Sequence, residues 1–426
     1  MYDCDLWVTP NLIVNSSVIF TNLPLFKVIF SMEGPRKVWY APFKKQAFGQ
    51  EEIEAVVSCL DDGWLAPGPR TAKFEAQVAA RFGKKFALFV NSGSSANMLA
   101  VICAGVIKGV EVITPACTFS TTVAPLVQNG ATVRFCDVAK DKYVPDVEQV
   151  LNEITSQTKV IMIPNLLGNK IDWALLRAEL TKMGRSDIVL IEDSCDTMTY
   201  TPQTDIATVS FYASHIITAG GTGGMVMFNE KSLYDRALRI RDWGRVGGND
   251  EGIASRFNHG ILGDIAYDWK FLYCEFGYNF KACEMNAAFG LEQMKKLPQF
   301  EKIRDDLLHR YMSNLKADPV ASKYYKFPIF KEGILFLAFP LACKDRMKLL
   351  TYLESNAVQT RVTMAGNILR HPLYRDQFPE ESQRSFPISD EVMREGFLIG
   401  CHHGLSFDDV DRVCDLLIKF ACEHHQ

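Results

Sequence analysis

The sequence predicts an α/β protein, with a large domain built on a mostly parallel seven-stranded sheet and a smaller C-terminal α/β domain. From residue 86 onward, short β-rich runs alternate with amphipathic stretches of helical length, which is typical of a parallel sheet covered by helices on both faces. After Pro298 this alternation gives way to a long charged helical stretch and shorter apolar runs. A chain of 426 residues, 48% of them hydrophobic, is long enough to bury both cores.

The elements follow in chain order. The expected strands of the large sheet are the apolar runs 86–90, 111–114, 132–136, 160–163, 188–192, 207–212 and 225–228. Helical length and periodicity mark 95–107, 144–154 and 173–183 between them. Farther on, we expect a helix over 299–315, strands at 324–327 and 334–339, and helices over 344–355 and 407–422. The predicted domains are therefore 36–298 and 299–426.

Residues 1–35 precede this pattern and are interpreted as an N-terminal extension. The apolar stretch 12–30 is interrupted by polar residues, and Asp3 and Asp5 stand before it in place of a basic stretch. It therefore makes a poor signal peptide and a poor membrane span. An extension upstream of a natural start at Met32 fits better.

Charge and cysteine content narrow the class of partner. The 46 basic and 50 acidic residues give a net charge of -4 without a run of like charge, which argues against nucleic acid or a membrane surface and favours a small molecule. The 12 cysteines stand singly, without a Cys-x-x-Cys pair or zinc-ligand spacing. Reduced thiols in the cytoplasm and no bound metal are the favoured interpretation.

The segment Asn91-Ser-Gly-Ser-Ser-Ala-Asn97 follows an expected strand and opens an expected helix. Gly93 permits a tight turn there. The hydroxyl and N–H groups of Ser94 and Ser95 would lie at a helix N-terminus, where unpaired donors and the helix dipole stabilise a phosphate. A plain helix cap explains the same residues equally well.

Two other strand ends carry candidate binding residues. Asp193 ends one strand, and at the carboxyl end of a parallel strand its carboxylate would point into a ligand crevice, where it suits a protonated ring nitrogen. Capping of a following turn is the commoner use of such an aspartate. Phe119 follows another strand and could stack on a flat ring, although most such phenylalanines belong to a core.

The most informative segment is 210–224, which has the layout of a pyridoxal-phosphate attachment segment but offers no amine. His215 stands where a lysine would be expected, and no lysine lies between Lys182 and Lys231. A cofactor aldehyde needs an amine to form a Schiff base. A cofactor bound here would therefore not be tethered, and His215 would do proton chemistry, while Ser210 would give a hydroxyl to the phosphate.

Taken together, these segments resemble the DegT-like family of nucleotide-sugar aminotransferases, fold-type-I pyridoxal-phosphate enzymes, over roughly residues 38–420. The matching stretches are 62–68, 91–97, 191–197, 210–224 and 277–291. Most members have lysine where His215 stands, and histidine there marks a sub-branch of sugar 3-dehydratases. The stretches 165–169, 241–245 and 360–367 resemble that sub-branch.

The resemblance implies a lyase that holds pyridoxal 5'-phosphate noncovalently and uses L-glutamate to convert it to pyridoxamine 5'-phosphate. The implied substrate is a nucleotide-linked 4-keto-6-deoxyhexose similar to GDP-4-keto-6-deoxymannose. His215 would act as base and acid while the C3 hydroxyl leaves, with release of ammonia and a 4-keto-3,6-dideoxysugar. Such sugars serve lipopolysaccharide and O-antigen synthesis.

The resemblance also assigns roles around the cofactor. Asp193 would pair with the pyridine nitrogen and Phe119 would stack on the ring. The residues implied for the phosphate are Ser94, Ser95 and Ser210.

Three further roles concern the partner subunit and the substrate. Asn279 would reach the phosphate of the partner subunit in a homodimer with shared active sites. Arg361 and Asn367 are candidate substrate contacts.

Two places depart from the relatives. The CDP-sugar dehydratases carry a close cysteine pair directly after the stretch that matches 241–245, where this chain reads Val-Gly-Gly-Asn. Cys195 could match one cluster ligand, but a [2Fe–2S] cluster takes four, so we expect no iron–sulfur cluster and a closer likeness to the GDP-sugar type. The glycine-rich tail after His215 also lacks the glutamate of the relatives.

Two other functions stay open. One is an aminotransferase that works without a tether, although it would lose its cofactor between half-reactions. The other is a catalytically inactive homologue that binds a ligand or a partner. The joint presence of Asp193, Ser94, Ser210 and His215 argues against decay of the site.

Overall fold

A seven-stranded sheet organises the protein, as the sequence predicts. In the computed structural model, the described residues are 36–43, 46–246, 252–257, 261–331 and 333–424, so the proposed N-terminal extension lies outside them. The strand order is β1-β7-β6-β5-β4-β2-β3, and only β7 runs antiparallel to its neighbours. The strands are β1 (Phe86–Val90), β2 (Glu111–Pro115), β3 (Thr132–Cys136), β4 (Thr158–Pro164), β5 (Val189–Asp193), β6 (Ile206–Ser210) and β7 (Gly224–Phe228).

Helices cover both faces of this sheet, which is why its strands are apolar on both sides. They are α2 (Pro69–Phe82), α3 (Gly93–Cys103), α4 (Ser120–Gln128), α5 (Val147–Leu151), α6 (Trp173–Lys182) and α7 (Lys231–Arg241). Two further helices are α1 (Gln50–Asp62), which contacts α9 (Glu284–Ala317), and the short α8 (Ile253–Arg256). Alternate strand residues pack against α3, α4 and α7 on one face. The opposite face packs against α2 over β1, β6 and β7, and against α5 and α6 over β2, β4 and β5.

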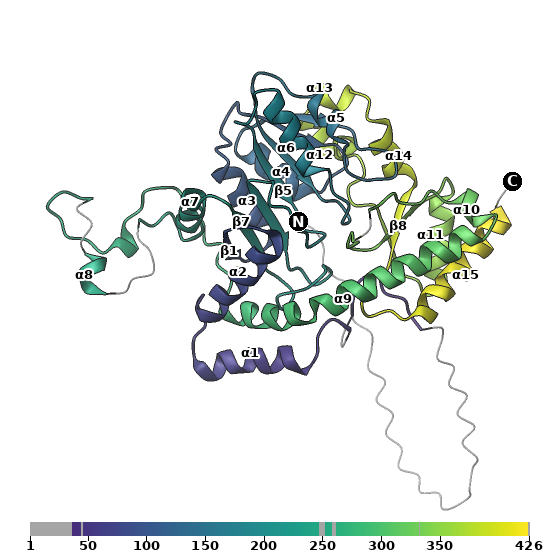
Figure 1. Ribbon diagram of the computed structural model, residues 1–426, viewed down its shortest axis with the longest axis horizontal. Coiled ribbons are helices and arrows are strands. Elements are labelled where there is room, and N and C mark those ends of the chain that lie inside the picture. The colour runs from purple at the N-terminus through teal and green to yellow at the C-terminus, as the bar shows by residue number, and fades with distance from the viewer. Residues whose placement is uncertain (1–35, 44–45, 247–251, 258–260, 332, 425–426) are drawn as a thin grey trace, which may run out of the picture. The chain divides into compact units, whose positions relative to one another are not determined.

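The helix expected over 299–315 is the second half of a longer one. Helix α9 (Glu284–Ala317) continues through Pro298, and it contacts α1 and α2 as well as α15 (Phe407–His424) (Figure 1). The expected boundary at residue 298 therefore falls inside a helix, and the division into two domains stays a prediction. Of the described helices, none is both long and apolar enough to cross a membrane.

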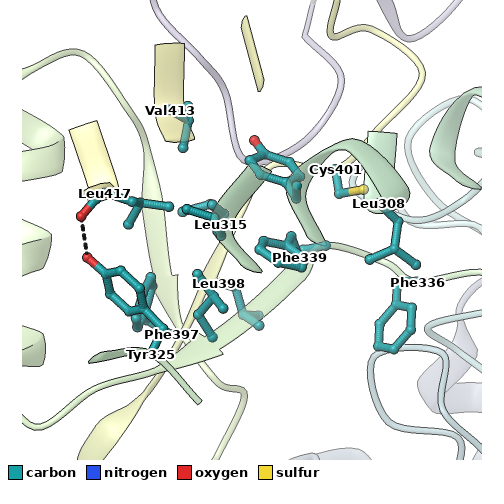
Figure 2. Close-up of a cluster of buried hydrophobic side chains, with 14 of the residues drawn as sticks. Leu308, Leu315, Tyr325, Phe336, Phe339, Phe397, Leu398, Cys401, Val413 and Leu417 are labelled. Atoms are coloured by element: carbon teal, nitrogen blue, oxygen red, sulfur yellow. Dashed lines mark hydrogen bonds between the residues drawn. The ribbon is translucent and has the colours of Figure 1, made fainter. Parts of the chain in front are cut away.

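A second, antiparallel sheet lies in the C-terminal part, in the order β8-β10-β9. It contains β8 (Phe339–Ala342), β9 (Thr360–Val362) and β10 (Gly396–Ile399). The remaining helices are α10 (Ala321–Tyr324), α11 (Arg346–Ser355), α12 (Pro372–Gln377), α13 (Pro379–Gln383) and α14 (Pro387–Glu395), with short 3-10 turns at Trp269–Phe271 and Ile368–Arg370. Figure 2 shows buried side chains of this C-terminal part, where the Tyr325 hydroxyl donates a hydrogen bond to the Leu417 carbonyl at 2.8 Å.

The two strands expected at 324–327 and 334–339 are wrong. Only one bridge, between Lys326 and Ala342, joins the first run to a strand. The second run, although buried, is mainly a connecting segment that enters β8 at Phe339. The Leu337 N–H donates to the Leu167 carbonyl at 2.8 Å, outside any ladder. An apolar run indicates burial here and not strand pairing.

Candidate active site

A cavity of about 420 Å³ opens where several strands end. Most of its lining comes from the last residues of β4, β5 and β6 and from the segments that follow β1, β2, β4, β5 and β6. In an α/β sheet, the carboxyl ends of parallel strands meet at one edge, and this is where ligands bind. Six predicted site residues line this cavity together: Gly93, Ser94, Phe119, Asp193, Ser210 and His215.

The turn before α3 presents helix donors to the cavity. Ser92 is the cap, and its Oγ accepts from the Ser95 N–H at 3.1 Å. The Ser95 hydroxyl donates to Asn91 Oδ1 at 2.7 Å. Ser95 therefore serves the turn itself and does not line the cavity, whereas Gly93 and Ser94 do. The first N–H groups of a helix have no partner within it, so they are available to an anion.

Gly93 is required by close packing and not by the tight turn that the sequence suggested. It is the first residue of α3, and its φ lies outside the left-handed region. A Cβ at this position would lie 2.6 Å from the Ser210 Cβ and 2.8 Å from the Cys195 Sγ.

The substitution Gly93→Ala is therefore expected to force these neighbours apart. We expect it to lower the free energy of unfolding by about 1–3 kcal/mol, as overpacking of a filled site does, and to weaken anion binding at the turn. Denaturant unfolding and titration with pyridoxal phosphate measure the two effects. Values equal to those of the unchanged protein would show that Ser210 and Cys195 move aside freely.

Asp193 is held in place by three hydrogen-bond donors. Its Oδ2 accepts from Asn97 Nδ2 at 2.8 Å and from the Thr122 hydroxyl at 2.7 Å, and its Oδ1 accepts from the Cys195 N–H at 3.2 Å. The Thr208 hydroxyl donates to Asn97 Oδ1 at 2.6 Å, which fixes the orientation of that amide. This network presents a buried carboxylate in a set position to the cavity.

Phe119 belongs to the cavity and not to a core. Its side chain is 50% exposed and lines the cavity at the start of α4. An exposed ring that lines the same cavity as a carboxylate is suited to stacking on a planar ligand.

His215 lies half-buried in the cavity wall, in the loop after β6. Its Nδ1 is 3.3 Å from the Ser210 carbonyl oxygen. Because a carbonyl only accepts, the neutral imidazole carries its hydrogen on Nδ1 and leaves Nε2 as a base. Burial lowers the pKa of His215 from 6.5 to about 4, with a smaller opposing effect from the Ser210 hydrogen bond.

An NMR titration can measure this pKa directly. In the ligand-free protein, an NMR titration of His215 is expected to show a midpoint near pH 4. Since the pKa is lower in the folded than in the unfolded chain, the stability that His215 contributes is present above about pH 6.5 and lost as the pH falls through about 4. A midpoint at or above 6.5 would mean that the imidazole is solvated.

Several lining residues escaped the sequence analysis as individual candidates. Asn165 follows β4, Asp196 follows Asp193, and Tyr40 comes from the N-terminal part of the described chain. The Asp196 Oδ2 accepts from the Leu167 N–H at 2.9 Å, and burial raises the pKa of Asp196 from 3.8 to about 7. The signal for the first two was their place in the segments that follow strands β4 and β5.

The other predicted residues lie outside the lining. Asn279 is exposed and bridges to Asp242. Arg361 is exposed, but its guanidinium lies 5.5 Å from the ring centre of Tyr40. Asn367 is fully buried, and its amide donates to Asp390 at 2.8 Å and accepts from a backbone N–H, so it serves the fold around it.

Whether a metal cluster is bound depends on residues that the structure does not describe. The place of the cysteine pair in CDP-sugar dehydratases falls at residues 246–249, of which the structure describes only Val246. Among the residues that it does describe, no three His, Cys, Asp or Glu side chains group as metal ligands. The absence of a cluster stays a prediction.

Comparison with known proteins agrees with this geometry. The model of the DegT/DnrJ/EryC1/StrS aminotransferase family matches residues 46–418. The lipopolysaccharide biosynthesis protein RfbH of Salmonella typhimurium is 31% identical over 407 residues, which cover 89% of this chain and 91% of RfbH. The dTDP-4-dehydro-2,6-dideoxy-D-glucose 3-dehydratase of Saccharopolyspora spinosa is 32% identical over 400 residues, covering 88% and 85%.

A solved structure is similar over the same length. GDP-4-keto-6-deoxy-D-mannose-3-dehydratase of E. coli, with bound hydrated PLP, superposes with a TM-score of 0.78 at 26% identity and covers 89% of this chain and all of that one. The protein is thus a pyridoxal-phosphate-dependent enzyme of fold type I, and it belongs to the DegT/DnrJ/EryC1/StrS aminotransferase family.

Proposed function

We propose that this enzyme is a 3-dehydratase that removes the C3 hydroxyl of a nucleotide-linked 4-keto-6-deoxyhexose. One observation carries the proposal: His215 lines the cavity with Nε2 available as a base, and none of the described lining residues is a lysine. An aminotransferase of this fold needs a lysine amine at that place to hold its cofactor and to move protons.

The residues present fit pyridoxal phosphate. The donors of Gly93 and Ser94 at the α3 N-terminus, with Ser210 beside them, suit the phosphate. The buried Asp193 suits the ring nitrogen, and the exposed ring of Phe119 suits the ring face. When bound, the cofactor ring supplies the electron sink for the reaction.

His215 would move the proton of the reaction. Its Nε2 would accept a proton from the cofactor-bound substrate and return it to the C3 oxygen as that hydroxyl leaves as water. The Ser210 carbonyl would keep the hydrogen on Nδ1 and so keep Nε2 directed to the substrate. The low pKa of the imidazole keeps it unprotonated, and therefore able to act as the base, at neutral pH.

Noncovalent binding follows from the same residue. In His215→Lys, an amine would stand at the cavity wall, and borohydride is expected to fix the cofactor to the protein with a gain of mass at residue 215. In the unchanged protein, no lysine is expected to carry the cofactor after the same treatment. Lack of attachment in His215→Lys would mean that residue 215 does not face the cofactor aldehyde.

We also propose a homodimer in which Asn279 of one subunit reaches the phosphate in the other. The segment around Asn279 exposes large apolar side chains, such as Phe276 at 103% and Phe271 at 58%, whose exposure to water is unfavourable. A second copy that covers this segment would bury them. Sedimentation with and without Phe276→Asp tests the interface.

The alternative is an aminotransferase that yields an amino sugar, which the family name favours. To separate the two, purified protein is incubated with pyridoxal phosphate, L-glutamate and either a GDP- or a CDP-4-keto-6-deoxyhexose. We expect mass spectrometry to find a sugar that has lost the C3 oxygen. An amino sugar as the product would contradict the proposal, and cofactor binding without turnover would favour an inactive homologue.

A further inference from the structure

The floor of the cavity contains an amide whose oxygen has no partner. Asn165 follows β4 directly, is fully buried and lines the cavity. Its backbone is fixed, because its N–H donates to the Asp193 carbonyl at 2.8 Å and its carbonyl accepts from the Gly168 N–H at 3.0 Å. Within the described part of the chain, its Oδ1 accepts no hydrogen bond. A buried acceptor without a donor is unfavourable, so this oxygen is suited to a donor that a ligand brings.

The amide nitrogen of Asn165 is fully used on the other side. Asn165 Nδ2 donates to Glu192 Oε1 and to Ser194 Oγ, each at 2.7 Å. These two bonds use both of its hydrogens. The side chain therefore has nothing left to donate, and only its oxygen remains open.

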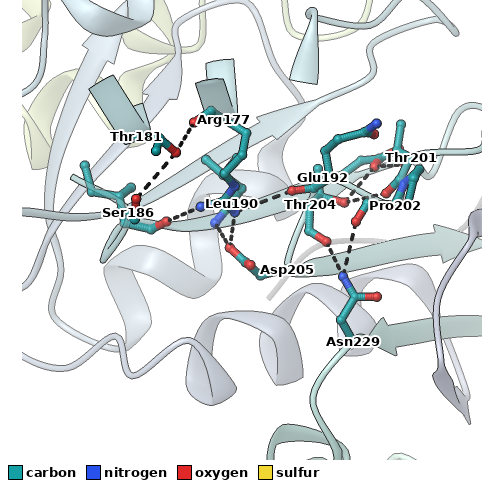
Figure 3. Close-up of polar contacts among 12 residues, drawn as sticks. Arg177, Thr181, Ser186, Leu190, Glu192, Thr201, Pro202, Thr204, Asp205 and Asn229 are labelled. Carbon is teal, nitrogen blue, oxygen red and sulfur yellow. Dashed lines mark hydrogen bonds and ion pairs between the residues drawn. The ribbon is translucent and has the colours of Figure 1, made fainter. Parts of the chain in front are cut away.

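Glu192 fixes which end of the amide faces it. Its Oε1 accepts from Asn165 and from the Ser194 hydroxyl at 2.6 Å, and its Oε2 accepts from the hydroxyls of Thr201 and Thr204 (Figure 3). All four acceptor positions of a carboxylate are then filled. If the Asn165 amide turned over, its Oδ1 would meet Glu192 Oε1, which only accepts, and would compete with Glu192 for the hydrogen of the Ser194 hydroxyl, so the observed orientation is favoured.

A buried lysine supports this carboxylate. Lys84 is 6% exposed, and its Nζ donates to the Thr201 carbonyl at 2.8 Å and to the Thr204 hydroxyl at 2.7 Å. Burial raises the pKa of Glu192, whereas the hydroxyl donors and the charge of Lys84 oppose that rise. The donors converge on Glu192 as they would on an ionised carboxylate.

We propose that Asn165 is a ligand-binding residue whose Oδ1 accepts a hydrogen bond from a hydroxyl or amine group of the molecule in the cavity, with Glu192 as its positioning residue. The inference rests on the proposed function, which places both a hydroxyl-bearing cofactor and a sugar in this cavity. It adds a selectivity: a ligand that offers only an acceptor or a methyl group at this point leaves the Asn165 oxygen unsatisfied and is bound more weakly.

Asn165→Leu tests the contact, with Asn169→Leu as the matched control. Asn169 is also buried and also donates twice, to the Lys142 and Ile329 carbonyls, but it does not line this cavity. For Asn165→Leu, we expect the affinity for pyridoxal phosphate to fall, or the KM for the nucleotide sugar to rise, by roughly tenfold or more. A lower affinity in the cofactor titration assigns the donor to the cofactor, and a higher KM without a change in cofactor affinity assigns it to the sugar.

Glu192→Gln tests the positioning role. Glutamine can donate as well as accept, so the Asn165 amide is free to turn over. We expect a smaller loss of the same affinity, with a changed KM and a nearly unchanged kcat, and no additional loss when Glu192→Gln is combined with Asn165→Leu. Additive losses in the double variant would overturn the positioning role, because a merely structural effect of Glu192 acts independently of Asn165.

The outcomes separate this inference from the proposed function. If the unchanged protein binds pyridoxal phosphate but Asn165→Leu binds and turns over equally well, the inference fails alone. If the unchanged protein releases an amino sugar, the proposed function fails, while the cofactor titration still tests Asn165. Asn165→Ser, whose side chain is shorter and polar, is used for the same measurements if thermal unfolding shows that Asn165→Leu is not folded.

Discussion

His215→Asn is expected to lower kcat by about 10²- to 10⁴-fold, the usual contribution of a positioned acid–base group. Asparagine cannot take up the proton that Nε2 would accept. The affinity for pyridoxal phosphate is expected to change little, because Gly93, Ser94 and Asp193 contact other parts of the cavity. Steady-state kinetics and a cofactor titration give the two values.

A control carries the same substitution elsewhere. His309 lies on α9, exposed and outside the cavity lining, with its Nδ1 2.9 Å from the Asp305 carbonyl oxygen. His309→Asn is expected to leave kcat unchanged within experimental error. If His215→Asn also retained kcat, another group would have to be the base.

Asp193→Asn is expected to weaken pyridoxal phosphate binding about 10- to 100-fold, since a hydrogen bond to a charged group contributes about 1.5–3 kcal/mol. The amide is neutral and cannot stabilise a protonated ring nitrogen. The NH₂ group of the new asparagine would also face either the cavity or the donor groups of Asn97 and Thr122. Turnover is expected to fall with binding and to remain low at saturating cofactor, because the ring would be a weaker electron sink.

Glu111→Gln is the matched control for a buried carboxylate. Glu111 begins β2 and accepts from the hydroxyls of Thr155 at 2.7 Å and Thr158 at 2.5 Å, away from the cavity lining. Its replacement is expected to affect the free energy of unfolding and not cofactor affinity. Equal cofactor affinity in Asp193→Asn and the unchanged protein would remove Asp193 from the site.

The sheet and much of the cavity were predictable because both follow from local patterns. Each of the seven strands is a short apolar run, and the structure confirms a mostly parallel sheet. Asp193 ends a strand, and Gly93 and His215 lie in the segments that follow two others, so their meeting at one edge follows from the fold class.

What escaped prediction depends on contacts between distant segments. Helix α9 passes through Pro298 because packing along its length outweighs a local helix-breaking residue. Asn367 lies in a stretch that resembles a substrate-binding segment, yet its amide donates a hydrogen bond to Asp390, 23 residues away in the sequence. The role of Asn165 depends on Glu192 and Lys84, which no spacing in the sequence links.

The most direct test follows the nitrogen of the amino donor. The enzyme is supplied with ¹⁵N-labelled L-glutamate, pyridoxal phosphate and a nucleotide-linked 4-keto-6-deoxyhexose, and the label is located by NMR and mass spectrometry after many turnovers. If His215 makes this enzyme a dehydratase, the label is released as free ammonia in equal amount to 2-oxoglutarate, and the sugar loses its C3 oxygen. Label retained on a sugar that keeps its C3 oxygen would contradict that claim.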